Sequence, residues 1–219
     1  MRNGVSDKHR LMSEAKSQGK HVREPRDDAA YFDALYAQNE DPWNLRTRWY
    51  ERRKRAIALS MLPRERYEHA FEPGCGIGEL TAMLGTRCAS VTAWDISTRA
   101  LAIARERVDA AHVQFERNTV PAHWPQGQFD LIVISELAYY LSGTQQRTLA
   151  QLIARGLAPQ GTLLACHWRH PIDDAKTSAL EAHRTLSDVS GLISVARYDD
   201  DDMVIDVWSN DGRSVATMA

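Results

Sequence analysis

The residues best suited to chemistry are three glycines at alternate positions, Gly74, Gly76 and Gly78, with an acid, Glu72, just before them. They follow a short apolar run and open a helix-like stretch. Glycine permits a tight turn and lets a ligand approach the backbone without a Cβ in the way, and the first N–H groups of the next helix are free to bind it. The next apolar run ends at Asp95, whose carboxylate can accept hydrogen bonds from both hydroxyls of a ribose. Together these residues predict a nucleoside-binding site.

The spacing of this loop separates it from other nucleotide-binding loops. Its glycines form G-x-G-x-G, whereas nicotinamide and flavin binders carry G-x-G-x-x-G. Glu72 would repel a pyrophosphate, but it suits a ligand with a cationic amino-acid end. The pattern therefore argues against a nicotinamide-dependent oxidoreductase and favours a nucleoside that carries an amino-acid group.

The elements that must position these residues are short apolar runs that alternate with helix-like stretches. Strands are expected at 69–72, 90–94, 112–116, 129–135 and 161–166, and helices at 78–84, 98–108, 145–156 and 177–188. Such alternation predicts an α/β fold with a parallel sheet covered on both faces. Two further strands, 192–198 and 203–208, are joined by four aspartates, which predicts a solvated turn and an antiparallel hairpin at one edge of the sheet. Ser97 is expected to cap the helix that follows it.

The N-terminal part of the chain has a different pattern. Apolar residues recur at helical spacing at 31–36, and a second helix with a strongly basic face is expected at 50–62, after a break at Asp41-Pro42-Trp43. Residues 1–28 almost lack large apolar side chains, so a disordered tail is predicted there. Residues 29–219 are expected to form a single domain, in which 29–65 cover the ligand site.

Composition excludes several classes of protein. The chain has 27 Lys and Arg against 29 Asp and Glu, a formal net charge of −2, which argues against a duplex DNA binder. No apolar run is long enough for a membrane span, and the N-terminus lacks the apolar segment of a secretory signal. Cys75, Cys88 and Cys166 are too few and too scattered for a disulfide framework or a thiolate zinc site. A reduced, cytoplasmic protein is therefore expected, with a small-molecule partner and neither nucleic acid nor membrane.

The glycine loop, its preceding acid and Asp95 resemble motif I and its successor in the S-adenosylmethionine-dependent methyltransferases. The run FDLIV at 129–133 resembles the fourth strand of that class, and LAPQGTLL at 157–164 resembles its turn into the fifth strand, with Gln160 in place of a glycine. The resemblance implies a Rossmann-like three-layer αβα sandwich whose seven-stranded sheet has an antiparallel last strand. It also implies S-adenosylmethionine as cofactor and S-adenosylhomocysteine as its product.

A narrower resemblance is to the NodS family. It is carried by Asp41-Pro42-Trp43, by the helix start Tyr50-Glu51-Arg52 and by SELAYYL at 135–141. Members of that family N-methylate the deacetylated glucosamine at the non-reducing end of chito-oligosaccharides during Nod-factor synthesis. The resemblance therefore implies N-methylation of an amino sugar. O-methylation of a hydroxylated metabolite, or a regulatory protein that binds the cofactor without catalysis, are the alternatives.

The resemblance places the cofactor on the loop and on the neighbouring strand ends, which gives the residues Trp43, Glu72, Gly74, Cys75, Gly76, Gly78, Asp95, Ile96, Asn118, Thr119, Val120 and Ser135. The stretch 117–120 departs from the family because it lacks the acid that commonly binds the adenine amino group. Asn118 or Thr119 would accept that hydrogen bond, less strongly than a charged acceptor. A basic residue at 52–54 is expected to meet the cofactor carboxylate, and Trp43 to pack on the adenine or close the site.

Two clusters at strand ends are candidates for the acceptor site and for catalysis. Glu136 could hold an ammonium or a sugar hydroxyl, and Tyr139 and Tyr140 could line the methyl pocket and stack on a sugar ring. The alternative is that the tyrosines pack in the core and the glutamate caps a helix.

The second cluster follows the fifth expected strand. His167 or His170 could take the amine proton because histidine titrates near neutrality, Trp168 could stack on substrate, and Arg169 could bind an anionic group. The alternative is a loop histidine with satisfied hydrogen bonds and an arginine paired with a local acid. No metal site is expected, because no further Cys or His accompanies the two histidines.

Overall fold

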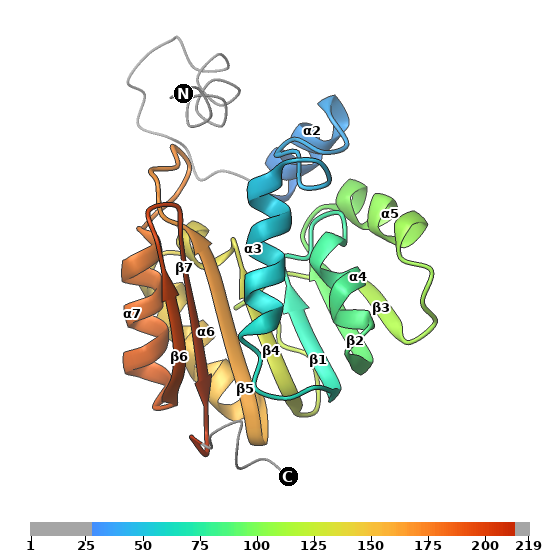
Figure 1. Ribbon diagram of the computed structural model, residues 1–219. Helices are drawn as coiled ribbons and strands as arrows, with labels where there is room; N and C mark the ends of the chain where they lie inside the picture. The colour runs from blue at the N-terminus through green and yellow to red at the C-terminus, as the bar shows by residue number, and fades with distance from the viewer. Residues whose placement is uncertain (1–27, 213–219) are drawn as a thin grey trace.

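Seven strands form one sheet in the computed structural model, which describes residues 28–212. Their order is β3-β2-β1-β4-β5-β7-β6, and helices cover both faces of the sheet (Figure 1). The predicted α/β class, Rossmann-like architecture and seven-stranded sheet are confirmed. The tail predicted at 1–28 lies outside the described residues except for Asp28, which opens helix α2.

Five strands of the sheet are parallel: β1 (Tyr67–Pro73), β2 (Cys88–Asp95), β3 (Val113–Arg117), β4 (Phe129–Ser135) and β5 (Leu157–Trp168). The helices between them are α4 (Glu79–Gly85), α5 (Thr98–Arg107) and α6 (Gly143–Gly156), with a short 3-10 turn η1 (Ala138–Tyr140). Ser97 accepts a hydrogen bond from the N–H of Ala100, so the predicted cap of α5 is confirmed. Because the strand order reverses between β1 and β4, a ligand crevice is expected at their carboxyl ends.

The C-terminal hairpin consists of β6 (Ile193–Asp199) and β7 (Met203–Ser209), which follow α7 (Ala179–Ser190). β7 is antiparallel to both β5 and β6, as predicted. The aspartate turn is more than a solvated connection, because Asp200 Oδ1 accepts hydrogen bonds from two backbone N–H groups, those of Asp202 and Met203, each at 2.9 Å. Its Oδ2 pairs with Arg53 at 2.9 Å, which ties the hairpin to helix α3.

The core lies on both faces of the central strands. In β4, Leu131 and Val133 pack into one apolar cluster, whereas Ile132 and Ile134 pack into the other, and all four are fully buried. The first cluster includes residues of α3, α4 and α5, and the second includes residues of α6 and α7. A continuous apolar run in β4 is therefore explained by a strand that helices cover on both sides.

Helix α2 (Asp28–Gln38) lies beside the carboxyl ends of the strands, and α3 (Trp49–Ser60) runs from that end across one face of the sheet (Figure 1). The basic face predicted for α3 is not simply solvated. Arg52 is exposed, but Lys54 and Arg55 are 3% and 8% exposed and lie inside the protein. Burial of two cations on one helix requires acidic partners, and these partners form part of the site described next.

Candidate functional site

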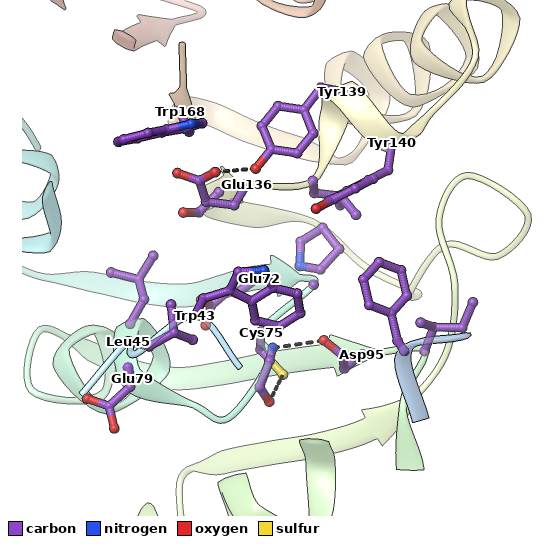
Figure 2. A pocket seen from close by; sticks show the side chains of 18 of the residues that line it. Trp43, Leu45, Glu72, Cys75, Glu79, Asp95, Glu136, Tyr139, Tyr140 and Trp168 are labelled. Carbon is purple, nitrogen blue, oxygen red and sulfur yellow. Dashed lines mark hydrogen bonds between the residues drawn. The ribbon is translucent and has the colours of Figure 1, made fainter. Parts of the chain in front are cut away.

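A cavity of about 220 Å³ opens at the carboxyl ends of β1, β2, β4 and β5, beneath α2 and α3. Most of the predicted site residues line it, namely Trp43, Glu72, Gly74, Cys75, Gly76, Asp95, Ile96, Asn118, Thr119, Val120, Ser135, Glu136, Tyr139, Tyr140 and Trp168. Figure 2 shows two groups on opposite sides, with Glu72, Cys75 and Asp95 below and Glu136, Tyr139 and Trp168 above. The cavity therefore joins the glycine loop to the first acceptor cluster.

The glycine loop is held to the end of β2 by Asp95. Its Oδ2 accepts a hydrogen bond from the N–H of Gly76 at 2.8 Å, and its Oδ1 accepts one from the N–H of Ser97 at 2.8 Å. Gly74 and Gly76 have φ values of 77° and 55°, a region that glycine enters without strain. Burial raises the pKa of Asp95, although these N–H groups act in the opposite direction. Asp95 thus holds its carboxylate in a fixed position beside a stretch of backbone whose glycines have no side chains.

Glu72 lies beneath the loop and is almost fully buried. Its Oε2 accepts a hydrogen bond from the Thr81 hydroxyl at 2.6 Å. Burial raises the pKa of Glu72 to about 8, and the nearby Asp95 adds to this effect while Thr81 opposes it. A carboxyl group of this kind gains its charge readily when a cationic ligand arrives.

Glu136 follows β4 with a φ of 55°, which is unusual for a residue other than glycine. Its Oε1 pairs with Lys54 Nζ at 2.8 Å, and its Oε2 accepts the hydroxyl hydrogen bond of Tyr139. Burial raises the pKa of Tyr139, and the charge of Glu136 raises it further, so this phenol keeps its proton. Such backbone strain is often found at functional sites.

Helix α3 contributes three ionic side chains to the cavity, Glu51, Lys54 and Arg55. Lys54 Nζ lies 2.7 Å from Glu51 Oε2 as well as 2.8 Å from Glu136, so that one ammonium serves two carboxylates. Arg55 lies 3.7 Å from Glu79 and donates to a backbone carbonyl of the preceding loop. Glu51 and Arg55 were missed by the sequence analysis.

Known proteins that are similar to this chain in sequence and in fold show the family to which it belongs. The family model of nodulation protein S (NodS) matches residues 34–189. The chain belongs to the NodS family. Nodulation protein S of Sinorhizobium fredii is 30% identical over 164 residues, which cover 70% of this chain and 76% of that protein.

Two solved structures extend the comparison. NodS N-methyltransferase from Bradyrhizobium japonicum, solved with S-adenosylhomocysteine, has a TM-score of 0.75 at 26% identity and covers 84% of this chain and 99% of its own. A protein from Pseudomonas syringae described as a methyltransferase is 44% identical, with a TM-score of 0.66 and coverage of 74% and 99%. Family and fold together identify this chain as a methyltransferase of the S-adenosylmethionine-dependent class.

Gly78 is the one glycine of the loop that does not line the cavity of this NodS-family chain. It stands at the N-cap of α4 with a φ of 81°. A Cβ added there would come within 3.1 Å of Val108 and 3.2 Å of Ala104, at the end of α5. Its predicted contact with a cofactor is therefore corrected to a role in the turn and in helix packing.

The prediction that His167 faces the substrate is wrong. His167 is fully buried and lies outside the cavity lining. Its Nε2 accepts the N–H of Ala138 at 3.0 Å, its Nδ1 meets His183 Nε2 at 2.8 Å, and His183 Nδ1 meets Asp206 at 2.7 Å. Burial lowers the pKa of His167 well below its ordinary value, and His183 adds to this effect. The residue holds the loop after Glu136 in place.

His170 and Arg169 also lie outside the cavity lining. His170 Nε2 pairs with Asp202 at 2.8 Å, and Arg169 pairs with Asp199 at 2.6 Å. Because β5 and β7 are antiparallel neighbours, the end of β5 lies beside the aspartate turn that precedes β7. Both His170 and Arg169 therefore pair with aspartates of this turn. The local acid pairing that the sequence analysis kept as an alternative is what the structure shows.

Aromatic residues form much of the remaining wall. Tyr140 packs edge to face on Phe32 of α2, with ring centroids 5.6 Å apart, and Trp43 packs on Tyr36 at the same distance. Trp168 packs on Tyr50 of α3 at 4.6 Å. The contacts of Tyr140 and Trp168 join the N-terminal helices to the strand ends, whereas that of Trp43 lies within the N-terminal segment. No helix in residues 28–212 is long and apolar enough to cross a membrane.

Proposed function

We propose that this chain transfers a methyl group from S-adenosylmethionine to the amino group of a sugar, with a deacetylated glucosamine at the end of a chito-oligosaccharide as the acceptor type. The observation that carries the proposal is one continuous cavity with two chemically different halves. The glycine-loop half offers a fixed carboxylate and bare backbone, and the other half offers carboxylates and aromatic rings. The first suits a nucleoside and the second a polar ring with an amine.

The residues present fit the cofactor. Asp95 is positioned to accept hydrogen bonds from ribose hydroxyls, and Ile96, Asn118 and Val120 line the place where a base would follow it. Glu72 is a buried acid suited to the ammonium of an amino-acid end. The methyl group itself is supplied by the sulfonium of the bound cofactor.

A cation for the carboxylate of that amino-acid end is also present. Of the basic residues expected to serve, Arg53 pairs with Asp200 and Lys54 is held between two glutamates. Arg55 lines the cavity next to them and has its nearest acid, Glu79, at 3.7 Å. We assign the contact with the cofactor carboxylate to Arg55, since a guanidinium can bind a carboxylate through two parallel hydrogen bonds.

The acceptor half suits an amino sugar. Trp168 and Tyr140 line this half with aromatic rings suited to contact a pyranose ring, and Glu136 supplies a carboxylate for an N–H or O–H group. NodS from Bradyrhizobium japonicum is an N-methyltransferase, which supports an amine as the group that is methylated. The three cysteines are free and buried, which suits a reducing compartment such as the cytoplasm.

Calorimetric titration with S-adenosylhomocysteine tests the cofactor site. We expect micromolar binding, about −8 kcal/mol, by the wild type and loss of binding by Asp95→Ala. Failure of the wild type to bind would overturn the proposal.

Mass spectrometry then tests the acceptor. A glucosamine tetramer should gain a methyl group in the presence of S-adenosylmethionine, whereas its fully N-acetylated counterpart should not. Methylation of the acetylated tetramer would favour O-methylation instead. Cofactor binding without turnover on either tetramer would favour a regulatory protein.

A further inference from the structure

The acceptor half of the cavity contains more negative than positive charge. Glu51 and Glu136 both pair with Lys54, at 2.7 and 2.8 Å from its ammonium. The neighbouring cation of α3, Arg55, lies toward Glu79 instead. Two carboxylates therefore share one ammonium in a largely buried place, where an uncompensated charge is costly.

Among Glu51, Lys54 and Glu136, the carboxylate oxygen that has no partner in the described part of the chain belongs to Glu51. Both oxygens of Glu136 are engaged, one by Lys54 and the other by the Tyr139 hydroxyl. Glu51 is 1% exposed and lines the cavity, and within residues 28–212 its Oε1 accepts no hydrogen bond. Its Oε1 also has no ion-pair partner there, because the contact with Lys54 is made by Oε2. A buried carboxylate oxygen of this kind is expected to be completed by a ligand.

We propose that Glu51 is the residue that binds the acceptor amine, by accepting an N–H hydrogen bond and by compensating the positive charge that the nitrogen gains. The inference rests on the N-methylation proposed above. The acceptor nitrogen uses its lone pair to form a bond to the methyl carbon while the carbon–sulfur bond breaks and its electron pair stays on sulfur. Positive charge thus passes from sulfur to nitrogen, and the methylated ammonium afterwards loses a proton to water. A fixed carboxylate beside the nitrogen stabilises that developing charge.

Lys54 has a different role in this arrangement. Burial lowers the pKa of Lys54, but the charges of Glu136 and Glu51 outweigh burial and raise it above its ordinary value. The ammonium therefore keeps its protons and is not a base for the acceptor. It holds the two carboxylates at a fixed distance from each other and leaves one negative charge for the ligand.

Glu51→Gln tests the assignment, because it removes the charge and keeps the volume. In the free protein this change leaves Lys54 and Glu136 as a balanced pair, so we expect the Tm to rise by about 2–4 °C. The Kd for S-adenosylhomocysteine should stay within about threefold of wild type, while kcat on a glucosamine tetramer should fall on the order of 10²-fold. Glu106→Gln, on the exposed face of α5, is the matched control and should change none of the three.

The outcomes separate this inference from the proposed function. A wild type that does not bind S-adenosylhomocysteine would overturn both. Normal cofactor binding with an undiminished kcat in Glu51→Gln would overturn the role of Glu51 alone. A lower Tm would make Glu51 a structural residue, and a lost cofactor site would make it a cofactor ligand, so either result would also refute the assignment.

A comparison of ligands supplies a test that needs no variant. In the presence of S-adenosylhomocysteine, the wild type should bind the glucosamine tetramer at least tenfold more tightly, about 1.4 kcal/mol, than its N-acetylated counterpart. Equal affinity for the two tetramers would contradict an amine-binding carboxylate, whatever the behaviour of the variant.

Discussion

Glu72 should make the free protein less stable as the pH rises, and Glu72→Gln should remove that dependence. The folded-state pKa is about 8, against an ordinary value of 4.5, because the carboxyl group is buried. Between these two values the unfolded chain has lost the proton and the folded chain still holds it. Unfolding free energy therefore falls by about 1.4 kcal/mol for each pH unit, or roughly 5 kcal/mol over the whole interval. The stabilising effect is complete below the unfolded pKa and is lost as the pH rises through the folded one.

The assay is urea unfolding of wild type and Glu72→Gln at several pH values between about 5.5 and 7.5, where the difference between the two proteins should change by about 3 kcal/mol. Glutamine can still accept the hydroxyl hydrogen bond of Thr81, so the comparison isolates the ionisation. Titrating groups that do not interact with Glu72 contribute equally to both proteins and cancel. Parallel curves would refute the reasoning, because they would mean that Glu72 is already ionised in the folded state at neutral pH.

Three more changes have definite expected outcomes. His167→Leu leaves the buried backbone N–H of Ala138 without its acceptor, which should lower the unfolding free energy by about 1–3 kcal/mol in a denaturant titration. An unchanged unfolding midpoint would show that the segment after Glu136 does not need this hydrogen bond. Gly76→Ala places a Cβ 3.1 Å from the Tyr36 hydroxyl at a φ of 55°, so calorimetry should show weaker binding of S-adenosylhomocysteine, by tenfold or more, about 1.4 kcal/mol, and equal affinity would contradict a close approach there. Arg55→Met should also weaken the binding of S-adenosylhomocysteine by about tenfold, whereas Arg53→Met should leave it unchanged. Weaker binding by Arg53→Met and unchanged binding by Arg55→Met would mean that the cofactor carboxylate does not contact Arg55.

The fold was readable from the sequence because short strand-like runs, the most apolar of them at 129–135, alternate with helix-like stretches. β4 was predicted at its observed bounds, since its residues 131–134 are apolar without interruption and it is covered on both faces. The C-terminal hairpin was readable for a different reason, because four consecutive aspartates cannot lie inside a strand core. β5 was predicted four residues too short at its start, because Pro159 and Gly161 suggested a turn that is in fact continuous with the strand.

The glycine-loop half of the site was also readable, because its residues are adjacent in sequence and their types are chosen by backbone geometry. The acceptor half was only partly readable. Glu51 and Lys54 sit in what looked like a solvated basic face, and their burial depends on Glu136, which lies far along the chain. The spacing of Glu51, Lys54 and Arg55 on one turn of helix was the available signal. The position of the His167 ring could not be predicted in the same way. Side chains alternate between the two faces of the sheet along β5, and the face on which His167 meets His183 and Asp206 follows from the register of β5 with β7.

The chain of contacts from Asp206 through His183 and His167 to the N–H of Ala138 has a direction. The N–H of Ala138 can only donate, so Nε2 of His167 accepts and its ring proton is on Nδ1. From Nδ1, His167 donates a hydrogen bond to Nε2 of His183, and His183 donates one from its own Nδ1 to Asp206. Neither ring can bind a second proton without breaking a link. The members therefore form one cooperative unit, in which a double substitution should cost less than the sum of its two single substitutions. Two histidines, the side chains usually associated with proton exchange, here act as a fixed spacer between strand β7 and the loop that carries Glu136.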